Sequence, residues 1–140
     1  MLDFNDVTEL LNEAFYTEMR ILEETVGGPY RNSAKISLWS YKKYKVTEQH
    51  TSIACNDLGL IRWDHLQTKS LAAACVLDEP GHTVLVMGSG IAKTNPAVVE
   101  LTAQNGEIEI RAWAREGLIK QRAAEKAVNA IRSVLVPTES

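Results

Sequence analysis

The sequence predicts an α+β domain in which an antiparallel sheet is packed by an N-terminal and a C-terminal helix. Apolar residues recur with the 3.6-residue period of a helix over residues 1–28 and again over residues 115–136. Between them lie β-branched and aromatic runs separated by Asn-Asp, Pro-Gly and Asn-Gly turns, which are typical of antiparallel strands. A chain of 140 residues, 45% of them hydrophobic, fits one domain, residues 1–140, with its own core.

The N-terminal helix is expected to cover residues 1–28. Its apolar stripe includes Val7, Leu11, Phe15, Met19 and Leu22. The glycines that follow Val26, together with the proline after them, end the pattern. Apolar residues also lie off this stripe, so the helix is suited to contact both its own sheet and another chain.

Two or three strands are expected next. Residues 35–47 alternate and then continue with β-forming residues, residues 51–55 make a second run, and a turn is expected over 56–59. A further strand is expected to begin at Leu60, Ile61 and Trp63.

Residues 64–79 leave two interpretations open. Asp64 can cap a helix, three consecutive alanines favour it, and the Pro-Gly pair at 80–81 would end it. The same apolar run also fits a buried strand, in which case residues 79–81 form a hairpin turn into residues 82–87. Helix is the favoured interpretation.

The last hairpin is defined by Asn105-Gly106, since a type I′ turn needs positive φ at both central residues. A two-residue loop places Gln104 opposite Glu107, and this register puts six apolar side chains on one face. On the other face it pairs Glu100 with Arg111, which we expect on the solvent side.

The C-terminal helix, over residues 115–136, completes the expected order. With a helix at 64–79, that order is similar to profilin-like and roadblock-like domains. With a strand there, it is similar to pleckstrin-homology-like domains. Both likenesses concern element order alone, so no residue role follows from them.

The stretch at residues 83–94 contains Gly-Ser-Gly and Lys-Thr, which suggests a phosphate-binding loop. When Lys93 and Thr94 are aligned with that motif, Met87 and Ala92 occupy its two glycine positions. Proline and a β-branched run follow where a helix should begin. The sequence therefore argues against a nucleotide site, although the loop could close over a partner or ligand.

A basic and aromatic run at residues 39–45 offers a surface for contacts. In a strand, Trp39, Tyr41, Lys43 and Lys45 would share a face, as in binders of single-stranded nucleic acid. The net charge of −3 and the lack of a nucleic-acid motif argue against that partner. A half-buried edge strand whose lysines discourage edge pairing is the simpler interpretation.

Residues for catalysis or metal binding are sparse. The three histidines have no metal-ligand spacing, and the two cysteines, Cys55 and Cys75, sit in apolar settings. We therefore expect no catalytic residue, no metal and no cofactor. Neither a secretory leader nor an apolar run long enough to span a membrane is present, which predicts a reducing, cytoplasmic location.

These observations predict a non-catalytic binding or adaptor domain that acts through protein–protein contacts, either with another protein or as a homodimer. The candidate contact residues are Phe15, Met19, Leu22, Trp39, Tyr41 and Lys43. The alternative is a small-ligand or lipid-binding domain whose pocket lies between sheet and helix, lined by Trp63 and Trp113. An enzyme is the third hypothesis.

Overall fold

A computed structural model describes residues 1–26, 33–69, 71–88, 95–116 and 122–135. The long helices and the strands are α1 (Phe4–Val26), α2 (Ser33–Tyr41), β1 (Lys45–Ala54), β2 (Ala73–Glu79), β3 (His82–Met87), β4 (Ala97–Gln104), β5 (Glu107–Glu116) and α4 (Ala123–Leu135). Between β1 and β2 lie a 3₁₀ turn (Leu58–Ile61), the short helix α3 (Trp63–Leu66) and a second 3₁₀ turn (Gln67–Lys69).

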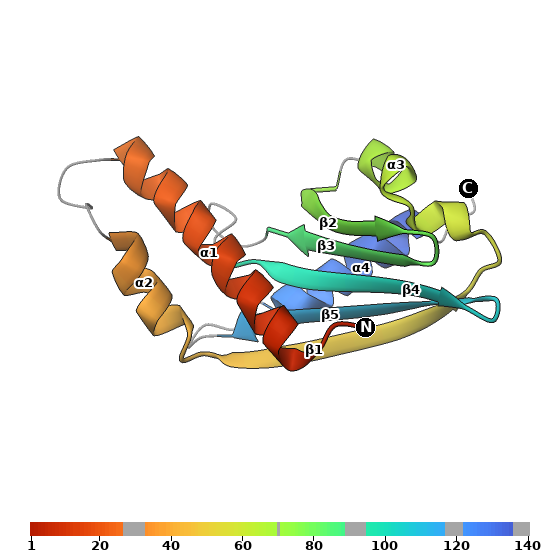
Figure 1. Cartoon of the computed structure of the whole chain (residues 1–140), viewed down its shortest axis with the longest axis horizontal. Coiled ribbons are helices and arrows are strands. Elements are labelled where there is room, and N and C mark those ends of the chain that lie inside the picture. The colour runs from red at the N-terminus through yellow and green to blue at the C-terminus, as the bar shows by residue number, and fades with distance from the viewer. Residues whose placement is uncertain (27–32, 70, 89–94, 117–121, 136–140) are drawn as a thin grey trace.

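The strands form one antiparallel sheet in the order β1-β5-β4-β3-β2 (Figure 1). Helix α1 crosses one face of the sheet with α2 beside it, and α4 lies on the opposite face. The molecule is therefore an α+β domain with helices at both ends of the chain, as the sequence predicts.

Each face of the sheet has its own apolar core. The larger core lies against α4 and contains Leu85, Leu101, Ile110 and Ile131, each 0% exposed. The smaller core lies beneath α1 and α2 and contains Val7, Leu11, Tyr41, Val84, Val98 and Trp113. Burying apolar surface on both faces holds the helices to the sheet.

The Asn105-Gly106 hairpin is confirmed in turn type and in register. Both residues have positive φ, 54° for Asn105 and 77° for Gly106. Gln104 pairs with Glu107, and the register continues unbroken to Ala97 and Ala114. One correction concerns Glu100, which pairs with Arg111 as expected but is 0% exposed instead of facing solvent.

The strand expected over residues 35–47 is wrong for its first part, because residues 33–41 form α2. Ala34, Leu38 and Tyr41 recur at helical spacing, and all three are turned inward, Ala34 and Tyr41 fully. The separate strand expected at 51–55 is the second half of the ten-residue strand β1.

The segment from residue 58 to residue 79 corrects two further expectations. Residues 58–69 form helical turns where a strand was expected at Leu60, Ile61 and Trp63. Because β1 and β2 are opposite edges of the sheet, this segment must cross the sheet to connect them. The favoured long helix at 64–79 is also wrong, since helix ends at Leu66 and residues 73–79 form β2 in a hairpin with β3.

At the C-terminal end, the helix expected over 115–136 is shorter, because β5 continues to Glu116 opposite Lys45. The resulting order, two helices before a five-stranded sheet, differs from both domain types named above.

The Gly-Ser-Gly and Lys-Thr residues after Gly88 lie outside the described residues. None of the described helices is both long and apolar enough to cross a membrane.

Candidate functional site

Two of the six predicted contact residues, Phe15 and Tyr41, pack against each other between α1 and α2. Phe15 of α1 stacks on Tyr41 of α2, with ring centroids 4.0 Å apart and ring planes at 2°. Tyr41 is only 3% exposed. Burial raises the pKa of its hydroxyl, and the nearby Arg115 guanidinium opposes that shift. This pair joins α1 to α2.

The other four residues lie nearer the surface. Trp39 is 64% exposed, and the Lys43 ammonium lies 3.4 Å from its ring centroid in a cation–π contact. Met19 and Leu22 are half-buried on α1. The structure therefore does not gather the six residues into one exposed surface.

The start of β2 forms an open edge of the sheet. β2 is the last strand of the sheet, and Gly88 N donates to Ala72 O at 3.2 Å. In an antiparallel pair this places the backbone groups of Ala72 and Ala74 toward β3 and those of Ala73 and Cys75 outward. Residues 72–76 are here called the β2 edge. Because Ala73 N donates to Leu71 O at 2.9 Å, the backbone groups that this edge directs away from the sheet without that bond are the Ala73 carbonyl and the N–H and carbonyl of Cys75.

The other end of β2 is closed by the segment that precedes it. Arg62 Nε donates to Asp78 Oδ1 at 2.8 Å, and Trp63 N donates to the same oxygen at 3.1 Å. These bonds, the Arg62 bond first, hold the pKa of the Asp78 carboxyl below its usual range. The register shift between Cys75 and Leu77 marks a bulge at which the open stretch ends.

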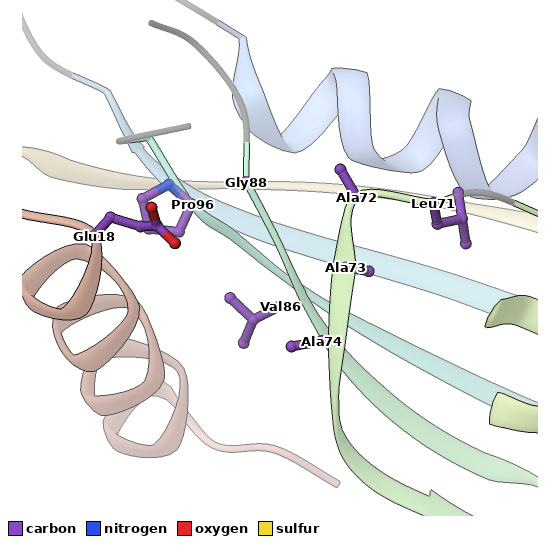
Figure 2. Close-up of a pocket in the computed structure, with 8 residues that line it drawn as sticks. All are labelled: Glu18, Leu71, Ala72, Ala73, Ala74, Val86, Gly88 and Pro96. Carbon is purple, nitrogen blue, oxygen red and sulfur yellow. The ribbon is translucent and has the colours of Figure 1, made fainter. Parts of the chain in front are cut away.

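Two cavities flank the β2 edge, one on each face of the sheet. The first, of about 370 Å³, lies between β2 and α1 and is here called the α1 groove (Figure 2). The second, of about 300 Å³, lies between β2 and α4 and is here called the α4 groove. Leu71, Ala72 and Gly88 line both.

Small and apolar side chains leave space in both grooves. In Figure 2, Ala74 and Val86 point from β2 and β3 toward α1, and Glu18 reaches from α1 toward Pro96. The α4 groove is lined by Met87 and by residues of α4 that are mostly alanines. A single charge belongs to each lining: Glu18 in the α1 groove and Lys126 in the α4 groove.

A buried carboxylate lies elsewhere on the α1 side of the sheet. Glu100 Oε2 accepts from Leu2 N at 2.9 Å and lies 2.7 Å from His82 Nε2. Its other oxygen, Oε1, has no hydrogen-bond partner among the residues that the structure describes, and Arg111 Nη1 is 3.9 Å away. Arg111 is itself bound to Glu48 at 2.8 Å. This network ties the first residues of the described chain to the middle of the sheet.

The other reactive side chains do not converge. His82 is the histidine bound to Glu100, and burial, followed by the nearby Asp78 charge, raises the pKa of the Cys75 thiol. A raised pKa disfavours the thiolate that a nucleophile needs. Among the described residues, no group of three or more His, Cys, Asp or Glu could hold a metal ion.

The two tryptophans expected to line a ligand pocket pack against the cores. Trp113 is 6% exposed beneath α1, and Trp63 is half-buried against the larger core. A third cavity, of about 400 Å³, lies between α1 and α2, and the residues that line it include Asn5, Glu9, Asn12 and Glu13.

Sequence reasoning missed the β2 edge because the alanine run was assigned to a helix. The signal was present in the alternative interpretation, a strand ending at the Pro80-Gly81 turn. An edge position follows only from sheet order, which one sequence does not reveal.

No family model, curated protein or solved structure matches the chain. The function is therefore inferred from the geometry of the chain itself.

Proposed function

We propose that this domain is a non-catalytic binding module that acts through protein–protein contacts, and that its partner adds an extended segment to the β2 edge. The observation that carries the proposal is the outward-facing backbone of Ala73 and Cys75 at this edge, with a cavity on each face of the sheet beside it. Strand addition uses such an edge, because backbone hydrogen bonds supply affinity and flanking pockets select side chains.

The exposure of apolar residues at this edge supports the proposal. Val76 is a large apolar residue, yet it is 48% exposed at the end of the open stretch. Ala72 and Ala74 are exposed as well. An added strand would cover these side chains and remove apolar surface from water.

The opposite edge of the sheet is less suited to strand addition. β1 is a ten-residue strand whose exposed residues are mostly charged or polar, with Lys45, Glu48, Gln49 and His50 among them. Charged side chains along an edge discourage pairing with another strand. The two edges thus differ in chemistry, and β2 is the one that favours a partner.

A display library of random 12-residue peptides tests the proposal. We expect the wild-type domain to enrich peptides whose affinity falls at least tenfold in Ala74→Arg, because arginine fills the α1 groove. Ala54→Arg is the matched control, since Ala54 is an exposed alanine at the end of β1. Binding should survive in that variant, and far-ultraviolet circular dichroism should show both variants folded.

The proposal fails if no peptide is enriched, or if the enriched peptides bind Ala74→Arg as tightly as wild type. Light scattering at two protein concentrations tests whether the protein forms a homodimer. A dimer that becomes monomeric in Ala74→Arg would support protein contacts through the β2 edge.

A further inference from the structure

The two grooves constrain the side chains of any strand added to the β2 edge, so this inference rests on the proposed function. Successive side chains of a strand point to opposite faces of the sheet. Neighbouring residues of the added segment therefore enter different grooves, one facing α1 and the other facing α4. The segment must supply two adjacent side chains, one that fits the α1 groove and one that fits the α4 groove.

The α4 groove suits a large aliphatic or aromatic side chain. Its walls are Met87 and Ala97 from the sheet and Ala123, Ala127 and Ala130 from α4. The short alanine side chains leave the space that a leucine or phenylalanine side chain would fill. Val86, Pro96 and Ala74 contribute apolar side chains to the α1 groove, which Glu18 also lines.

One charged side chain lines each groove, and the two charges are opposite in sign. Glu18 is half-buried in the α1 groove, and within the described residues it makes no ion pair. Lys126 lines the α4 groove and likewise has no ion-pair partner in the described part of the chain. A cation on the α1 side and an anion on the α4 side of the added strand would pair with them.

We infer that the partner is a different protein, whose extended segment has two adjacent large apolar residues with a basic residue on the α1 side and an acidic residue on the α4 side. Side chains on the same face of a strand are two residues apart. The charged residues therefore lie two positions from the apolar residue that shares their groove.

A second copy of this chain fits that pattern poorly. In a two-fold antiparallel pairing of two β2 strands, the α1 faces of both copies lie on the same side. Glu18 of one copy would then share that side with Glu18 of the other. The strand Ala73–Glu79 contains two acidic residues and no basic one, so it cannot supply the cation.

Reversing the charge of Glu18, and separately that of Lys126, tests the inference with the same peptide library. We expect peptides selected on wild type to carry Lys or Arg on the α1 side, and to lose at least tenfold affinity for Glu18→Lys. Changing that basic peptide residue to Glu should restore binding to Glu18→Lys. Lys126→Glu should act in the same way on the acidic position, whereas Glu13→Lys, elsewhere on α1, should change affinity less than twofold.

Three results would overturn the inference. Peptides that depend on Ala74 but bind Glu18→Lys and Lys126→Glu unchanged would refute the charge pattern and leave strand addition standing. A wild-type dimer that dissociates in Ala74→Arg would identify a second copy as the occupant. Absence of any enriched peptide would refute both the inference and the proposed function.

Discussion

Replacing Tyr41 by phenylalanine should make the protein more stable, although most substitutions of buried residues destabilise. The Tyr41 hydroxyl is buried and has no hydrogen-bond partner among the described residues. A buried polar group without a partner costs roughly 1–3 kcal/mol of folding free energy. Tyr41→Phe removes that group and keeps the ring that stacks on Phe15.

The expected gain is about 1 kcal/mol, the lower end of this range, because removing the hydroxyl oxygen also removes its van der Waals contacts in the folded state. A chain of this length has an unfolding entropy of about 0.3 kcal/mol/K, so the midpoint of thermal unfolding should rise by about 3 °C. Tyr44→Phe is the matched control. Its ring is 40% exposed, so its stability should change by less than about 0.5 kcal/mol.

Alkaline pH gives the same substitution a second, independent readout. Because burial raises the pKa of the Tyr41 hydroxyl, the folded state favours the protonated form. The contribution of this raised pKa to the free energy of unfolding is fully present below the ordinary tyrosine pKa of about 10, and it is lost as the pH rises above that value. Tyr41→Phe should therefore lose less stability than wild type above about pH 10.

Thermal unfolding followed by circular dichroism measures both effects. A loss of 1 kcal/mol or more in Tyr41→Phe at neutral pH would refute the reasoning, since it would mean that the hydroxyl makes a stabilising hydrogen bond. Identical alkaline unfolding of wild type and variant would show that the hydroxyl ionises freely.

Three further predictions concern the hairpin, an ion pair and the buried carboxylate. Gly106→Ala should destabilise by about 2 kcal/mol in chemical denaturation, and Gly81→Ala by about 1 kcal/mol. Both residues have positive φ, but only at Gly106 would the new Cβ lie 2.8 Å from a neighbouring amide oxygen. Asp78→Asn should lower the unfolding temperature at pH 7, and the difference from wild type should vanish as the pH falls below about 4, since the folded pKa of Asp78 is depressed. His82→Ala should cost about 2 kcal/mol because it leaves Glu100 buried with fewer partners. A double variant that also carries Glu100→Leu should be more stable than the sum of the two single changes, and simple additivity would contradict the pairing.

Local signals predicted those parts of the fold that depend on neighbouring residues. The Asn105-Gly106 turn determines its own register, so the pairs from Gln104 and Glu107 back to Ala97 and Ala114 followed from two residues. The 3.6-residue period over residues 1–28 likewise predicted α1, which the structure describes over Phe4–Val26.

Elements whose identity depends on distant packing were not predicted. Residues 33–41 have strand-forming composition, but they form a helix that packs against α1, where Tyr41 stacks on Phe15. Glu100 shows the same limit at the level of one side chain. Its pairing with Arg111 follows from the register, whereas its burial depends on Leu2 and His82, which are distant in sequence.

The alanine run at residues 72–74 connects the main error in the fold to the proposed site. Alanine has the highest helix propensity, so three in a row favour a helix when the sequence is considered alone. In the folded chain this run pairs with β3 through the turn after Glu79, and strand pairing outweighs the local preference. At an edge, side chains this small leave cavities on both faces that larger strand-forming residues would fill. Substituting Ala73 and Ala74 by valine would thus raise the strand propensity of β2 and, for the same steric reason, should abolish peptide binding at the β2 edge.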